Sequence, residues 1–211
     1  MSERSSVQRA VAATLALATV LLATLMLISG PPTRWFGLSH PGVFHGRDVS
    51  REDWGGPFTL SDMSNQARSL SDFRGKVVLL SFGYTHCPDV CPTTLAKFAE
   101  VRRLLGTDGD RVQALFVTVD PVRDTAELLR NYVPSFDPSF IGLRGTEEQT
   151  DAVTRAFHAN YQISNYRGNI TVEHTASTFV IDTNGKTRIV TPYDQSAREL
   201  ADDVIALLRT G

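Results

Sequence analysis

KVVLLSFGYTHCPDVCP, residues 76–92, is the stretch of sequence that decides the fold. It opens with a continuous apolar run, which is expected of a central strand covered on both faces, so Lys76–Tyr84 is predicted to be a buried strand. It ends with Cys87 and Cys91, and a helix is predicted from Pro92 to about Leu105. Functional groups in parallel α/β sheets collect at the carboxyl ends of the strands. The stretch therefore predicts an α/β fold with a thiol site at that edge of its sheet.

Apolar and polar segments alternate through the rest of the chain, as they do in α/β proteins. Asn184-Gly185 is a hairpin signal, so the last two strands are predicted to form an antiparallel pair in a mixed sheet flanked by helices. The final helix is amphipathic, with Leu200, Val204 and Leu207 on its inward face. The other predicted elements are strands over 57–60, 112–119, 140–143, 178–181 and 186–191, and helices over 125–133, 147–161 and 196–208.

The N-terminal region contains an uncharged segment that is long enough to cross a membrane. Residues 10–33 carry no charge, and about 20 helical residues span the hydrocarbon layer. Arg4 and Arg9 precede the segment, which by the positive-inside rule leaves the N-terminus in the cytoplasm. A cleaved signal peptide is the competing interpretation, but the apolar run is long and no A-x-A pattern ends it. We expect an anchor over 1–30, a tether over 31–53 and a folded domain over 54–211. The anchor is expected to cross the bacterial inner membrane once, so that the folded domain lies in the periplasm.

The composition argues against two classes of protein, nucleic-acid binders and small disulfide-stapled domains. The 211 residues include 42% hydrophobic residues, 21 basic and 23 acidic residues, for a formal charge of −2. There is no basic excess of the kind that phosphate backbones select, so nucleic acid is not an expected partner. Two cysteines are too few for a small domain held together by disulfides, so we expect the thiols to have a chemical role and not a structural one.

The two cysteines lie four residues apart, and each precedes a proline. Cys91 is predicted at the mouth of the helix, where unpaired N–H groups and the helix dipole favour a thiolate. The two Cα atoms are expected to lie about 6 Å apart, which is compatible with a disulfide. Spacing alone leaves both a metal site and a disulfide open.

Four motifs occur in order along the chain: GKVVLL at 75–80, CPDVCP at 87–92, DPVRDT at 120–125 and VEHT at 172–175. In this pattern the sequence resembles the Sco/SenC family of thioredoxin-like copper proteins, from about residue 57 to the final helix. The resemblance implies a thioredoxin-like fold and copper bound by Cys87, Cys91 and His174. It also implies an auxiliary role for Asp120, in tuning the site or meeting a partner.

The ligand chemistry agrees with this resemblance. Two thiolates and an imidazole form a soft set that suits Cu(I), and a further weak oxygen ligand or water would accommodate Cu(II). Structural zinc usually takes four firm protein ligands, whereas three are apparent here. Ordinary thioredoxins carry a cis-proline in the loop before the final hairpin, and Ala176-Ser177-Thr178 has none. That departure counts against a general disulfide exchanger.

Other polar residues have simpler interpretations. His40 and His45 are expected in the tether, and His158 inside a helix. Asp124, followed by Glu127, has the pattern of a helix N-cap and capping box. Three charged residues near the final helix are expected to be solvated: Asp202, Asp203 and Arg209. His86 adjoins Cys87, and its side chain is expected either to raise thiolate character or to point into solvent.

The resemblance implies a copper metallochaperone that helps assemble the copper centre of cytochrome c oxidase. The expected partners are the oxidase's copper-binding subunit and another periplasmic copper chaperone. The enzymatic alternative is a periplasmic thiol-disulfide reductase that uses Cys87 and Cys91 to keep the oxidase subunit's cysteines reduced. A copper or redox sensor would use the same site. Peroxidase chemistry is a weaker alternative because the second cysteine lies so close to the first.

Overall fold

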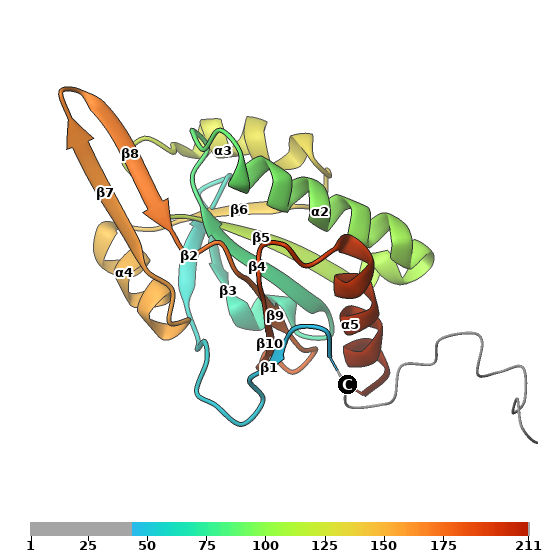
Figure 1. The fold of residues 1–211 in the computed structure, drawn as a ribbon. Coiled ribbons are helices and arrows are strands. Elements are labelled where there is room, and N and C mark those ends of the chain that lie inside the picture. Colours follow the sequence, from blue (N-terminus) through green and yellow to red (C-terminus); the bar gives the residue numbers. More distant parts are fainter. Residues whose placement is uncertain (1–43, 211) are drawn as a thin grey trace, which may run out of the picture. The chain divides into compact units, whose positions relative to one another are not determined.

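The computed structural model describes residues 44–210, and an eight-stranded mixed sheet forms the centre of this part of the chain (Figure 1). The strand order is β1-β10-β9-β4-β5-β6-β2-β3. Strands β4, β5 and β6 run parallel to one another, and β9 runs antiparallel to β4. The strands are β1 (Arg47–Asp48), β2 (Thr59–Asp62), β3 (Ala67–Ser69), β4 (Val77–Gly83), β5 (Val112–Thr118), β6 (Ile141–Arg144), β9 (Thr178–Ile181) and β10 (Thr187–Thr191).

The predicted central strand is confirmed. Every residue of β4 is buried, as is every residue of β5, which pairs with it. The aromatic rings of Phe82, Phe157 and Phe179 pack together against this centre with centroid separations of 5.2–5.9 Å. The apolar run therefore fixes both the middle of the sheet and the place where the cysteine loop leaves it.

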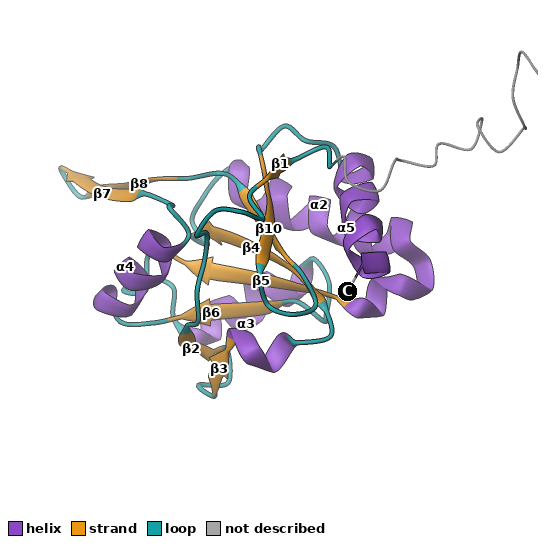
Figure 2. Cartoon of the chain, turned by 90° about the horizontal axis from the view of Figure 1, so that it is seen from below, coloured by secondary structure: helices purple, strands orange, loops and turns teal. Residues whose placement is uncertain are grey.

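In the described part of the chain, four α-helices cover the sheet: α2 (Val90–Leu105), α3 (Ala126–Tyr132), α4 (Glu147–Ala156) and α5 (Ala197–Thr210). Helices α2 and α5 lie side by side, and α4 lies across the sheet from them (Figures 1 and 2). The inward face predicted for the last helix is confirmed, because Leu200, Val204 and Leu207 are fully buried. Short 3-10 helices at Leu70–Phe73, Gly106–Arg111 and Val133–Ser135 complete the connections.

The helix predicted over 147–161 is confirmed over 147–156, and its last five residues are wrong. Helix α4 ends at Ala156, and a two-stranded hairpin, β7 (Tyr161–Tyr166) with β8 (Asn169–His174), follows it. This hairpin pairs only with itself and projects from the body of the domain (Figure 1). Its turn is Arg167-Gly168, whose φ angles of 53° and 86° are both positive, as tight hairpin turns require. His158 accordingly lies outside the helix, with a φ of 49° and its Nε2 atom 2.9 Å from the Asp53 carbonyl oxygen.

The fold includes residues that the sequence assigned to the tether. Strand β1 pairs with β10, and Val49 is fully buried. The backbone N–H groups of His45 and Gly46 donate to the carboxylate of Asp203, at 2.7 and 3.0 Å. Asp203 was expected to be solvated, but it is buried because it holds this segment against α5. The folded part thus begins about ten residues before Trp54.

The apolar segment expected to form an anchor lies outside the described residues. Within residues 44–210, no helix combines the length and hydropathy that a membrane span requires.

Candidate metal centre

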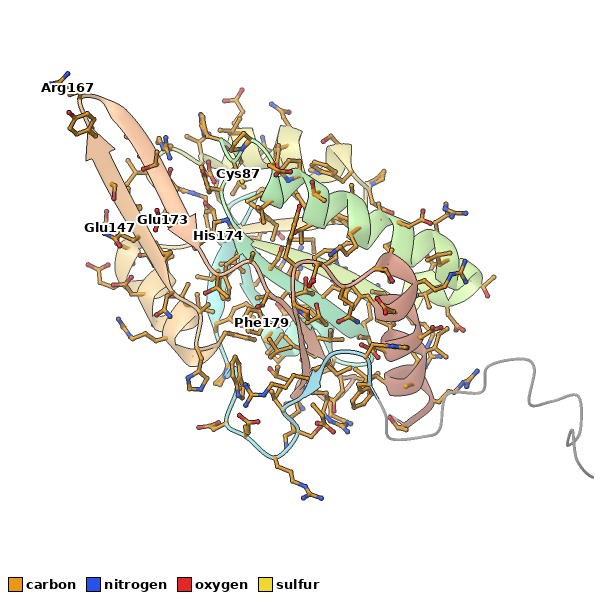
Figure 3. The ribbon with its side chains drawn as sticks, in the orientation of Figure 1. Cys87, Glu147, Arg167, Glu173, His174 and Phe179 are labelled. Carbon is orange, nitrogen blue, oxygen red and sulfur yellow. The ribbon has the colours of Figure 1, made fainter. Side chains whose placement is uncertain are left out.

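Cys87, Cys91 and His174 come together at the carboxyl edge of β4, although 83 residues separate Cys91 from His174. Their candidate ligand atoms, the two Sγ atoms and one imidazole nitrogen, all lie within 4.8 Å of one another. Cys91 Sγ is 3.4 Å from His174 Nε2. Figure 3 shows Cys87 and His174 at the same end of the sheet, where the hairpin joins the body. Ligand atoms arranged trigonally around one ion, with bonds of about 2.0–2.3 Å, lie about 3.8 Å apart, so the cluster has the size of a metal site.

The cysteine loop closes onto the first turn of α2. Asp89 is the N-cap of that helix, which begins at Val90, two residues before the predicted start. The N–H of Cys87 donates to the Tyr84 carbonyl at 3.3 Å, and the N–H of Cys91 donates to Cys87 Sγ at 3.4 Å. The first-turn N–H group of Cys91, which has no helical partner, is thus satisfied by the neighbouring thiol.

Cys91 is buried, with an exposed fraction of 3%. It fits there because Gly83 has no side chain: a Cβ atom at that position would lie 2.8 Å from Cys91 Sγ and 2.6 Å from Phe116 Cε2. Burial raises the pKa of the Cys91 thiol, and a backbone hydrogen bond from Tyr84 offsets only part of that rise. The thiolate predicted for Cys91 at the helix mouth is therefore wrong for the metal-free protein, in which Cys91 keeps its proton.

His174 is the last residue of β8, and its ring is oriented by a backbone carbonyl. The Nδ1 atom lies 3.0 Å from the Thr175 oxygen, and because a carbonyl can only accept, Nδ1 carries the proton. Burial lowers the pKa of His174, so the ring is neutral and the lone pair on Nε2 faces the Cys91 thiol. A histidine whose other nitrogen donates to a carbonyl is the usual arrangement in metal sites.

Asp124 anchors the cysteine loop, a role that the sequence did not reveal. Its carboxylate is fully buried and accepts hydrogen bonds from the Thr85 N–H at 3.0 Å, from Thr85 Oγ1 at 2.6 Å and from Thr118 Oγ1 at 2.5 Å. The predicted N-cap role is wrong: Thr125 caps α3, accepting from the N–H of Leu128. Asp124 instead ties the loop after β4 to the end of β5.

Asp120 and His86 are not part of the cluster. Asp120 is buried and forms an ion pair with Arg123. His86 is about half exposed, and its Nδ1 atom lies 3.1 Å from Thr85 Oγ1. Among residues 44–210, the histidine, cysteine and acidic side chains close enough to hold one ion are those of Cys87, Cys91 and His174.

Tyr84 is a residue of the site that the sequence analysis missed. Its ring meets the His174 imidazole edge to face, with a centroid distance of 5.9 Å and an interplanar angle of 88°. Its position directly after β4, three residues before Cys87, was the available signal.

Comparison with known proteins places this arrangement in a family. The SCO1/SenC family model matches residues 47–209. An SCO2-like protein of Rickettsia prowazekii is 37% identical over 151 residues, which cover 70% of this chain and 74% of that protein.

Solved structures share the fold. Bradyrhizobium japonicum ScoI with copper bound is 38% identical, with a TM-score of 0.68, over 74% of this chain and 99% of that chain. The solution structures of apo Sco1 from Thermus thermophilus are 39% identical, with a TM-score of 0.69, over 82% of this chain and 99% of that chain. The mixed sheet flanked by helices is thus the thioredoxin-like fold of Sco proteins. With its cysteine pair and His174 inside the matched region, the chain belongs to the SCO1/SenC family.

Proposed function

We propose that this protein is a copper metallochaperone that carries copper on Cys87, Cys91 and His174 for assembly of the copper centre of cytochrome c oxidase. The observation that carries the proposal is the compact set of two sulfur atoms and one unprotonated imidazole nitrogen, all within 4.8 Å. Family membership supports it, as does the copper bound in Bradyrhizobium japonicum ScoI.

The donor set fits copper as cargo. Two thiolates and an imidazole suit Cu(I), and a further weak oxygen ligand would serve Cu(II). Binding requires Cys91 to release its proton, whereas His174 already presents a free lone pair. Cys87 is only partly buried, so ligands of a partner can approach and replace the three donors one at a time. The oxidase's copper-binding subunit is the proposed recipient, and another periplasmic copper chaperone is the proposed donor.

The proposal includes a location. The uncharged segment over 10–33, preceded by Arg4 and Arg9, supports a single membrane anchor with the N-terminus in the cytoplasm. The copper-binding domain would then face the periplasm at the bacterial inner membrane.

A second candidate function is thiol-disulfide reduction, and one observation favours it. Cys87 and Cys91 are both free, with Cys87 Sγ accepting from the Cys91 N–H, so the sulfurs are close enough to form a disulfide after little movement. In this reaction the two thiols would be oxidised to a disulfide while a disulfide of the oxidase subunit is reduced to two thiols. A copper or redox sensor would use the same pair.

Variants of the three residues in a host that lacks its own copy separate these functions. The chaperone proposal predicts that His174→Ala abolishes oxidase assembly as completely as Cys87→Ser or Cys91→Ser, because each removes a copper ligand. Assembly is measured from the oxidase activity of membranes. Normal assembly with His174→Ala, together with failure of both cysteine variants, would contradict copper delivery and favour the reductase.

A further inference from the structure

The hairpin β7–β8 has an open outer edge on each strand. Within residues 44–210 its two strands form a sheet of their own and pair only with each other. A two-stranded hairpin is only marginally stable by itself in water, and exposed sheet edges are usually protected by proline, lysine or a covering element. The sequence of β8, NITVEH, contains neither proline nor lysine. The edge of β8 is therefore available to a further strand.

The register of the hairpin shows which backbone groups point out from β8. At its base the Thr175 N–H donates to the Asn160 carbonyl oxygen at 2.9 Å. Opposed residues of an antiparallel pair alternate between hydrogen-bonded and non-hydrogen-bonded positions, so the positions of His174, Val172 and Ile170 are non-hydrogen-bonded. Their N–H groups point away from β7 and form no backbone hydrogen bond with any other described residue.

The open edge of β8 leads to the proposed copper ligands. Strand β8 ends at His174, whose Nε2 atom is 3.4 Å from Cys91 Sγ. Strand β7 lies on the side of α4 (Figure 1), where the Tyr161 hydroxyl donates to the Asp151 carboxylate at 2.6 Å. A strand added to the edge of β8 would therefore run directly to the copper ligands, whereas one added to β7 would run toward α4.

We propose that the edge of β8 receives an extended strand of the protein that exchanges copper with this one, through the backbone groups of Ile170 and Val172. The inference rests on the proposed function, because it takes copper exchange as given. A partner that exchanges copper must bring its own donor atoms to the ion. Because Cys91 is buried, these atoms must approach beside Cys87 and His174, where β8 ends.

Strand addition also defines the chemistry of the partner. Backbone hydrogen bonds to an open edge supply affinity, and contacts with alternate side chains supply specificity. Ile170 is 37% exposed, so the partner segment should carry an apolar side chain opposite it and copper-binding donors beyond its end. The transfer is a ligand exchange that leaves copper as Cu(I): bonds to the partner's donors form as the bonds to His174 and the two sulfurs break.

The test removes one N–H group from the edge of β8. Ile170→Pro deletes an outward N–H, and proline is tolerated in edge strands where the N–H faces solvent. Ile163→Pro is the matched control: Ile163 lies opposite Val172, so its N–H also points outward, but from the edge of β7. The two isoleucines are 46% and 37% exposed, Ile163 being the more exposed.

The full-length wild type and both variants are loaded with Cu(I), and the rate of transfer to two acceptors is measured. One acceptor is the copper-binding domain of the oxidase subunit. The other is the small chelator bathocuproine disulfonate, which needs no docking surface. The dissociation constant for Cu(I) is measured for each protein as well.

Ile170→Pro should slow transfer to the protein acceptor about 10-fold, the effect of losing one hydrogen bond. Transfer to the chelator and the affinity for Cu(I) should match wild type, because the three ligands are unchanged. Ile163→Pro should match wild type in all three measurements.

A second pair of variants serves if Ile170→Pro weakens Cu(I) binding, which would show that the proline disturbs the hairpin. Ile170→Lys and Ile163→Lys keep the N–H groups, and lysine in an edge strand opposes the addition of another strand. Transfer to the protein acceptor should then be slowed in Ile170→Lys and unchanged in Ile163→Lys.

Three results would overturn the inference. The first is transfer from the Ile170 variants to the protein acceptor at the wild-type rate. The second is equal slowing by the Ile163 variants, which would exclude a role specific to the edge of β8. The third is a wild-type dimer in sedimentation that Ile170→Pro dissociates, which would assign the edge to a second copy of the chain.

Failure of the proposed function gives a different result, a wild-type protein that binds no copper. The affinity of the metal-free protein for the same acceptor domain would then test the edge. Weaker binding by Ile170→Pro than by Ile163→Pro would support the added strand, and equal binding would exclude it.

Discussion

Cys91 and His174 illustrate how burial sets the protonation of a site at the scale of single residues. Burial raises the pKa of the Cys91 thiol and lowers the pKa of the His174 imidazole. In both cases burial is the largest cause, because it disfavours the charged form of the group. In the metal-free protein both groups are therefore neutral, and the thiol faces the free Nε2 atom at 3.4 Å. For these two side chains to bind copper, only one proton has to leave, that of the Cys91 thiol.

These two shifts predict the pH dependence of stability without metal. Below the ordinary His pKa of 6.5, the unfolded chain binds a proton that His174 resists in the fold, so stability falls as the pH drops. Above the ordinary Cys pKa of 9.0, the unfolded chain loses a proton that Cys91 keeps in the fold, so stability falls as the pH rises. The free energy of unfolding measured with urea on the metal-free protein should thus fall both below pH about 6.5 and above pH about 9. Cys91→Ala should make the fall at alkaline pH smaller. An alkaline limb that is unchanged in Cys91→Ala would contradict the assignment.

The sequence predicted which residues gather but not how they ionise. The resemblance pointed to the two cysteines and His174, and the expected position of Cys91 at a helix mouth suggested a thiolate. The Cys91 sulfur is buried against Gly83, where an added Cβ would meet both this sulfur and the Phe116 ring, and this packing depends on the pairing of β4 with β5, which residue spacing does not encode. Asp124 was misread for the same reason, because its partners Thr85 and Thr118 come from two different strand ends.

At the scale of elements, Asp124 joins the loop after β4 to the end of β5 and thereby holds the cysteine loop in place. Asp124→Ala leaves the donors of the half-buried Thr85 and the buried Thr118 without an acceptor, which should cost about 2–4 kcal/mol of unfolding free energy. It should also weaken copper binding, since Cys87 follows Thr85 by two residues. Chemical denaturation and copper titration measure the two effects.

Asp110→Ala is the matched control, because the Asp110 side chain is 91% exposed, and it should change stability by less than about 0.5 kcal/mol. If Asp124→Ala were as stable as this control, the anchoring role would be wrong.

Strongly patterned elements were predicted well, and the hairpin β7–β8 was not. The buried strands β4 and β5 and the last helix carry unambiguous apolar patterns, and the Asn-Gly turn identified the final antiparallel pair. Residues 161–164 and 170–173 alternate apolar and polar side chains over only four positions each, and most of the described side chains of both strands are exposed. The turn Arg167-Gly168 was the available signal, but no strand was predicted between the helix, which was expected to end at residue 161, and the strand expected over 178–181.

At the scale of the whole molecule, residues 44–53 belong to the fold. Strand β1, the buried Val49 and the hydrogen bonds to Asp203 join this segment to β10 and α5. A chain that starts at residue 54 lacks Val49 and exposes the apolar surface that Val49 covers. It also leaves the Asp203 carboxylate with only Gln195 as a hydrogen-bond donor. It should be less stable than a chain that starts at residue 44 by about 2–5 kcal/mol. Urea denaturation compares the two chains, and equal midpoints would show that the segment contributes nothing.

The central claim is that three side chains form one copper site, and a copper titration of the full-length protein tests it most directly. Wild type should bind one equivalent of Cu(I), and one of Cu(II) with a thiolate-to-Cu(II) absorption band. His174→Ala should bind both at least about 100-fold more weakly, because a ligand is lost rather than a second-shell partner. His45→Ala, with its partly exposed side chain at the start of the described fold, should match wild type. A wild-type protein that binds neither ion, or a His174→Ala variant with unchanged affinity and spectrum, would contradict the account.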